Sequence, residues 1–229
     1  MAGSTDTDSS IRGIFLADVA DIRGIRGGTV DDLIAAIEAL PDREDVSVKR
    51  AMTYWSRARQ ANVAGNLAEA REQWMAFGGL FDQFKIEASL EATRCDILAG
   101  DAVLARSDFE LSAAAPRRGR LIEAERRTCL GGIAAIEGRV AESLAHYRVV
   151  LASLREIGAI WDEALCAIDM ATVLDPDDPE VRAAADAGRV ILTRLGATPF
   201  LAQLDAAMSR DVGPRSPSQV ASPAEVATS

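Results

Sequence analysis

Apolar residues recur at helical spacing along most of the chain. Leu33, Ile34, Ile37 and Leu40 fall at i, i+1, i+4 and i+7, which places them on one face of a helix. A second stripe at helical spacing consists of aromatic residues, namely Trp74, Phe77, Phe81 and Phe84. No segment shows the strict alternation of apolar and polar residues that is typical of a β-strand. The pattern therefore predicts an all-α protein.

Turn signals divide these helical stretches at a nearly constant interval. Each signal is a glycine followed by a polar residue: Gly28-Thr29, Gly65-Asn66, Gly100-Asp101 and Gly138-Arg139. The steps between the glycines are 37, 35 and 38 residues, and Pro176-Asp177 follows after another 38. A period of this length predicts stacked helical hairpins, because a single hairpin can bury its apolar face only against its neighbours.

Three of the turns are followed by the same pair of residue types. A small residue stands five positions after the glycine and an aromatic residue stands nine after it: Ala70 and Trp74, Ala105 and Phe109, Ser143 and Tyr147. This arrangement resembles the tetratricopeptide repeat, in which the small residue allows close helix packing and the aromatic residue fills the next layer. The first and last units depart from it, and the period exceeds the usual length of about 34 residues. The resemblance implies a superhelix of about five antiparallel hairpins.

The helical pattern covers residues 11–209, which we interpret as one helical-repeat domain. We expect a disordered leader at 1–10 and a disordered tail at 210–229, because neither segment has enough large apolar residues to offset the entropy cost of ordering. Between Pro199 and the tail, Phe200, Leu201 and Leu204 predict a short C-terminal capping helix that covers the last hairpin.

The stretch from Arg194 to Asp205 reads Arg-Leu-Gly-Ala-Thr-Pro-Phe-Leu-Ala-Gln-Leu-Asp. It is similar to the end of the helical-repeat region in large bacterial signalling proteins, which couple an ATPase module to a cyclase or to a LuxR-type DNA-binding domain. The resemblance implies a stand-alone relative or a fragment of such an ATPase-containing regulator. We therefore expect a bacterial protein of signalling or transcriptional regulation.

Charge and hydropathy narrow the range of partners. The formal net charge is −10 and the pI is about 4.7, so the chain as a whole repels phosphate backbones and direct nucleic-acid binding is not expected. No apolar run has the length needed to span a bilayer, and the first ten residues lack the basic and apolar parts of a secretory signal. We expect a cytoplasmic protein that does not bind membranes.

The residue types that carry catalytic chemistry are scarce and scattered. His146 is the single histidine, so any Ser-His-Asp or Cys-His apparatus would depend on it. Cys95, Cys129 and Cys166 are separated by 34 and 37 residues and form no CxxC pair, which favours small core residues over zinc ligands. The Gly131-Gly132 pair follows no strand, which favours close helix packing over a nucleotide loop. We expect no enzymatic activity and no catalytic, cofactor or metal site.

The predicted architecture favours a non-catalytic interaction module. The first helices of stacked hairpins line a concave groove, and arginines on them could hold an acidic or extended peptide through charge-assisted hydrogen bonds. The candidate groove contacts are Arg50, Tyr54, Arg57, Arg94, Arg126 and Trp161. The alternative is an effector-sensing domain, in which the groove near Tyr54, Trp55 and Trp161 closes over a small molecule.

Overall fold

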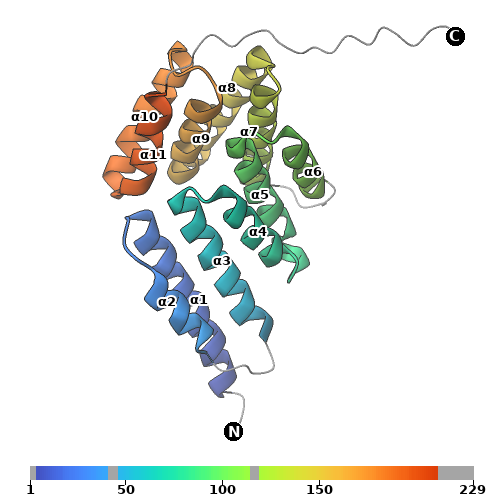
Figure 1. Cartoon of the computed structure of the whole chain (residues 1–229), viewed down its shortest axis with the longest axis vertical. Helices are drawn as coiled ribbons and strands as arrows, with labels where there is room; N and C mark the ends of the chain where they lie inside the picture. The colour runs from blue at the N-terminus through green and yellow to red at the C-terminus, as the bar shows by residue number, and fades with distance from the viewer. Residues whose placement is uncertain (1–3, 41–45, 114–118, 211–229) are drawn as a thin grey trace, which may run out of the picture.

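The computed structural model describes residues 4–40, 46–113 and 119–210 (Figure 1). Within these ranges it contains eleven α-helices, one short 3-10 helix and no strand, which confirms the predicted all-α class. None of the described helices is both long and apolar enough to cross a membrane. Of the predicted tail, 210–229, only Arg210 is among the described residues.

The helices follow one another with short connections and cover nearly the whole described chain. Their bounds are α1 Ser4–Ile25, α2 Asp31–Glu38, α3 Val46–Ala64, α4 Leu67–Gly78, the 3-10 helix η1 Asp82–Phe84, α5 Lys85–Ala99, α6 Ala102–Ala113, α7 Arg120–Ile136, α8 Val140–Ile157, α9 Ile160–Val173, α10 Pro179–Leu195 and α11 Thr198–Met208.

Left-handed glycines mark most of the connections. Gly65, Gly100 and Gly138 have φ of 75°, 79° and 82°, a conformation that a side chain disfavours, so each ends one helix and lets the next turn back along it. The first turn differs from the prediction, because Gly27 rather than Gly28 has the positive φ. Helix α2 is capped at Val30 without a side-chain hydrogen bond.

Two predicted helix boundaries are wrong. The first helix starts at Ser4, so residues 4–10 are helical rather than a disordered leader. Extending an existing helix costs far less than nucleating one, which allows residues of low apolar content to join it. Helix α4 ends at Gly78, so the aromatic stripe from Trp74 to Phe84 does not lie on one continuous helix, because two adjacent glycines destabilise a helix interior. A Cβ on Gly78 would lie 2.6 Å from the Cβ of Ala88, so this glycine permits a close crossing of α4 over α5.

Small and aromatic residues pack as the repeat pattern predicts. Ala70, Ala105 and Ser143 are completely buried, as are the aromatic residues Trp74 and Tyr147, whereas Phe109 is half-buried. The Gly131-Gly132 pair also serves packing, since a Cβ on Gly132 would lie 2.7 Å from the side chain of Ile97. Close approach between helices thus depends on residues with little or no side chain.

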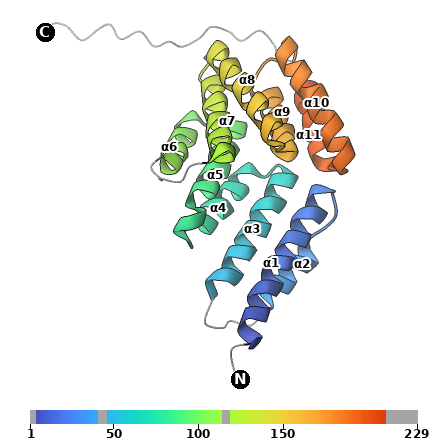
Figure 2. The same ribbon diagram turned by 180° about the vertical axis from the view of Figure 1, so that it is seen from behind.

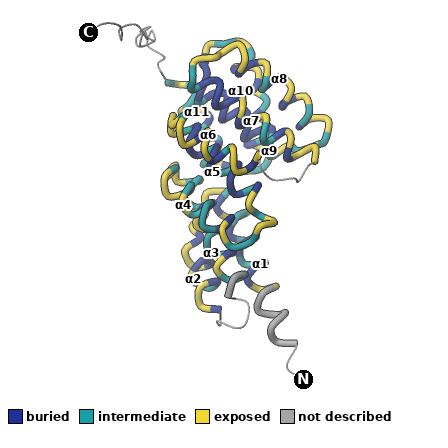
Figure 3. The backbone as a smooth tube through the Cα atoms, turned by 90° about the vertical axis from the view of Figure 1, so that its right-hand side faces the viewer, coloured by how far each residue is buried: buried dark blue, intermediate teal, exposed yellow. Residues whose placement is uncertain are grey.

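Helix α9 is the centre of the larger core. All nine residues from Glu163 to Ala171 are buried, and the helix contacts α5, α7, α8, α10 and α11. Figure 3 shows the buried positions running through the interior of this part of the molecule, with exposed positions on the outer turns. A smaller aromatic core around Trp74 and Phe77 joins α3, α4 and α5.

The two ends of the described chain meet. Figures 1 and 2 show α1, α2 and α3 in the lower part of the view and α9, α10 and α11 in the upper part, and α11 contacts both α1 and α3. The Gln203 side-chain amide donates to the carbonyl oxygens of Asn62 at 3.1 Å and Val63 at 3.2 Å. Just after α11, the Arg210 guanidinium donates to the carbonyl oxygens of Thr172 and Leu174. Helix α11 therefore covers the last hairpin, as the sequence predicts, and also bridges to the N-terminal helices.

The close crossings can be tested within one helix. Ala70→Trp should lower the free energy of unfolding by about 1–3 kcal/mol or more, because no space exists for the ring. Ala68→Trp, on the exposed face of the same helix, should change it little. Urea or thermal unfolding monitored by circular dichroism measures both. Equal midpoints for the two variants would contradict the packing described for α4.

The capping role of α11 rests on Leu204, which is fully buried. Leu204→Ala should cost about 2–5 kcal/mol through lost burial and the cavity left behind. Leu130→Ala, at a position that is 37% exposed on α7, is the matched control and should cost much less. Denaturant unfolding gives both values, and binding of a hydrophobic dye should increase only for Leu204→Ala.

Candidate functional site

Side chains from six helices line a partly open cavity of about 170 Å³. Helices α3, α5, α7 and α9 supply most of its wall, and α4 and α8 contribute Trp74 and Leu154. We call it the central cavity. Its lining consists of Trp55, Arg59, Trp74, Glu87, Leu90, Glu91, Arg94, Glu125, Thr128, Cys129, Leu154, Trp161, Asp162, Leu165, Cys166 and Asp169.

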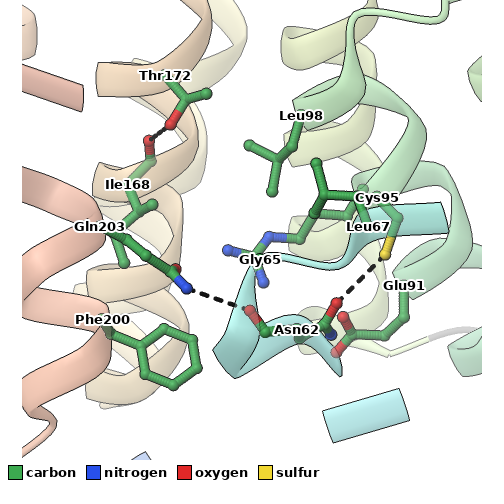
Figure 4. A pocket seen from close by; sticks show the side chains of 11 residues that line it. Asn62, Gly65, Leu67, Glu91, Cys95, Leu98, Ile168, Thr172, Phe200 and Gln203 are labelled. Atoms are coloured by element: carbon green, nitrogen blue, oxygen red, sulfur yellow. Dashed lines mark hydrogen bonds between the residues drawn. The ribbon is translucent and has the colours of Figure 1, made fainter. Parts of the chain in front are cut away.

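A second cavity of about 180 Å³, the side cavity, lies between α3, α5, α9 and α11 (Figure 4). It shares Glu91 and Arg94 with the central cavity. Its other contacts are mostly apolar or internally bonded: the Cys95 thiol donates to the Asn62 side-chain oxygen, and Gln203 donates to the Asn62 carbonyl. Because its polar groups are bonded to each other, the side cavity offers fewer groups to a ligand than the central cavity.

Tryptophan rings form one wall of the central cavity. The rings of Trp55 and Trp74 meet edge to face, with centroids 5.1 Å apart. The guanidinium carbon of Arg59 lies 4.9 Å from the Trp55 centroid and 5.2 Å from that of Trp74, within the range of a cation–π interaction. Trp161, which also lines the cavity, packs edge to face on Phe200 with centroids 5.0 Å apart. These contacts fix the rings in place before any ligand arrives.

Both arginines of the central cavity are already neutralised. Nε of Arg94 donates to the two carboxylate oxygens of Asp169 at 2.9 Å and 2.8 Å. Burial disfavours the charge on Arg94, but Asp169 more than compensates and the pKa of the guanidinium is raised overall. Arg59 lies 3.4 Å from an oxygen of Asp21 and 3.5 Å from an oxygen of Glu91. Neither guanidinium is left to attract an anion.

Glu125 is a cavity carboxylate on which the charge of Arg59 acts only at a distance. It makes no hydrogen bond and no ion pair with any residue that the structure describes, although it lines the cavity. Burial raises its pKa to about 8, and the nearby charges of Glu91, Asp162 and Glu87 add to the effect. Burial likewise raises the pKa of Asp162. The cavity therefore holds carboxyl groups whose ionised form is disfavoured by burial.

The surroundings of the three cysteines and of the histidine indicate structural roles for them. All three cysteines are buried, and burial raises the pKa of Cys95 to about 12 and those of Cys129 and Cys166 further above the ordinary value. Such thiols are protonated and unreactive, which agrees with their interpretation as small core residues. His146 does not line either cavity. No group of three or more potential metal ligands occurs among the described residues.

Only two of the predicted groove contacts lie in the central cavity, Arg94 and Trp161. Arg50 is exposed, Tyr54 is half-buried in the aromatic core, and Arg57 is exposed and paired with Glu38. Arg126 donates to the carbonyl oxygen of Ser112 and pairs with Glu123. The arginines thus do not form a common basic surface, because Arg57, Arg94 and Arg126 are each bound to an acidic or carbonyl partner.

The sequence analysis missed the acidic side of the cavity. Glu87 and Glu91 stand at i and i+4, and so share one face of α5, a spacing that was open to detection. Glu125 and Asp162 had no such signal, because each is a single carboxylate on its own helix. Only the packing of α5, α7 and α9 brings these groups together.

Comparison of the chain with protein-family models, with curated proteins and with solved structures gives no match in any of the three.

The raised pKa of Glu125 predicts a pH dependence of stability. Between the ordinary value near 4.5 and about 8, the folded state holds a proton that the unfolded state has lost, so its contribution to stability falls as pH rises through this window. Glu125→Gln removes the titration. Relative to the wild type, this variant should gain stability from pH 5 to pH 9, on the order of a few kcal/mol.

Thermal and urea unfolding across this pH range measure the difference between variant and wild type. Glu69→Gln, at an exposed position on α4, provides the control and should follow the wild type at every pH. A Glu125→Gln difference that stays constant with pH would show that Glu125 titrates alike in the folded and unfolded chain.

Proposed function

We propose that this chain is an effector-binding regulatory module that holds a small molecule in the central cavity. The observation that carries the proposal is the cavity itself. It is lined by helices from successive units of the chain and presents three tryptophan side chains and the carboxyl group of Glu125 to its interior. Ligand sites in proteins commonly combine apolar and aromatic walls with a few oriented polar groups.

We further propose a tetratricopeptide-like superhelix of about five hairpins. Helices α3, α5, α7 and α9, which supply most of the lining, are the helices that precede a turn in each unit. First helices of successive hairpins line the concave face of such stacks, so the position of the cavity agrees with this arrangement. The buried small residues at Ala70, Ala105 and Ser143 give the same support to the repeat register.

A small ligand suits this interior better than a long acidic peptide. An acidic peptide would need free arginines in the groove, but Arg94 is paired with Asp169 and Arg59 with Asp21 and Glu91. An extended peptide would also need an open groove, whereas α11 bridges from α9 and α10 to α3. The regulatory setting, in bacterial signalling or transcription control beside an ATPase-containing protein, rests on the resemblance of the segment from Arg194 to Asp205.

Protein docking is a second candidate function, and one observation favours it. Helix α1 leaves four large apolar side chains exposed: Ile11 at 59%, Ile14 at 45%, Phe15 at 64% and Ile22 at 57%. A stripe of this kind on one helix is typical of contact surfaces. It lies on the outside of the stack, so a protein partner there would leave the central cavity accessible. Neither candidate function involves catalysis.

A thermal-shift screen of metabolites tests the effector proposal. Two variants on α7 then show whether a stabilising compound binds in the central cavity. Thr128 lines the central cavity, so Thr128→Trp should fill it and abolish stabilisation by any compound that stabilises the wild type. Arg127→Trp, one residue away on the exposed face, should respond as the wild type does. Compounds that stabilise Thr128→Trp equally well would show that the ligand site is not the central cavity.

A further inference from the structure

The charges that line the central cavity point to the chemistry of its ligand, an inference that rests on the function proposed above. Five carboxyl groups line it against two guanidinium groups: Glu87, Glu91, Glu125, Asp162 and Asp169 against Arg59 and Arg94. Asp169 and Arg94 satisfy each other at 2.8 Å. Even with Glu87 set aside, the carboxyl groups of Glu91, Glu125 and Asp162 outnumber the one remaining guanidinium, and an excess of carboxyl groups attracts a cation.

The chain itself supplies an example of cation binding in this cavity. The Arg59 guanidinium lies over the Trp55 and Trp74 rings while carboxylates of Asp21 and Glu91 approach its nitrogens. A cation is thus held by aromatic faces on one side and acids on the other. On α9, Trp161 and Asp162 likewise supply an aromatic ring and a carboxyl group to the cavity. Helix α7 adds the carboxyl group of Glu125. No described cation forms an ion pair with Glu125.

We propose that the central cavity binds a compact organic cation, an amine or quaternary ammonium compound, with its charged nitrogen near Glu125 and Asp162 and its carbon atoms against Trp161 and Leu165. Aromatic faces and carboxylates are the groups that recognise such ligands. Apolar cavities of about 150 Å³ accept a molecule the size of benzene, so the volume of about 170 Å³ limits the ligand to a similar size. A bare metal ion fits less well, because no three potential ligands among the described residues converge on one point.

Cation binding should be coupled to proton release. The pKa of Glu125 is about 8, so much of this group is protonated near neutral pH, and a bound cation would favour its ionised form. Affinity should therefore rise with pH between 6 and 9, and protons should pass to the buffer on binding. The charged and titratable groups that surround Glu125 in the cavity are Arg59 on α3, Glu87, Glu91 and Arg94 on α5, Cys129 on α7, and Asp162, Cys166 and Asp169 on α9.

Isothermal titration calorimetry with choline and agmatine as probes tests the proposal on the full chain. Dimethylbutanol, the neutral carbon isostere of choline, serves as the matched control ligand. We expect a cationic probe to bind, the neutral isostere to bind at least tenfold more weakly, and the measured enthalpy to vary with the ionisation enthalpy of the buffer.

Glu125→Gln should weaken cation binding tenfold or more, and Glu69→Gln should not change it. Since Glu125→Gln is expected to be at least as stable as the wild type, a loss of binding cannot be ascribed to unfolding.

The alternative outcomes separate this inference from the proposed function. If a neutral or anionic compound from the metabolite screen binds the wild type but not Thr128→Trp, and the cations do not bind, the ligand class is wrong and the effector site stands. If Glu125→Gln binds choline as the wild type does, Glu125 is not the charge partner and the inference fails. If no compound of any class binds, both the inference and the effector proposal fail.

Discussion

The buried ion pair between Arg94 and Asp169 determines the shape of the interior. It joins α5 to α9 across 75 residues of sequence, and the side chains of Arg94 and Asp169 are only 17% and 3% exposed. A buried pair contributes little net stability, but removal of one partner leaves an uncompensated charge and costs about 3–5 kcal/mol. The pair therefore acts mainly on geometry, because it ties α5 to α9 at the wall of the central cavity.

The carboxyl groups of the cavity work against folding. Burial and mutual repulsion raise the pKa of Glu125, and burial raises that of Asp162. Ionisation of either group therefore lowers the stability of the folded state. Apolar residues at these positions would make a more stable core. Groups that reduce stability while lining a cavity are typical of binding sites, where activity and stability compete. The well-packed cores on either side, around Trp74 and around α9, offset this loss of stability.

Local sequence patterns were sufficient to predict the helices. The bounds of α8 and α10 follow from a glycine or proline at each end, and the buried positions of Ala70 and Tyr147 follow from their distance to a turn glycine. Errors arose at helix ends, as at the early start of α1, where an existing helix extends at low cost, and at Gly78, where two adjacent glycines end α4. The acidic side of the cavity was beyond prediction, because Glu125 and Asp162 lie 37 residues apart and meet Glu91 only after several helices have packed.

Closure by Gln203 changes how the array should fold. In an open stack each unit touches only the next, so stability is close to a sum over units and folding can begin anywhere. Here a side-chain amide of α11 binds backbone carbonyls 140 and 141 residues earlier. Such distant contacts raise the contact order and slow folding. The protein thus resembles a closed globule in its cooperativity, although its sequence reads as a periodic array.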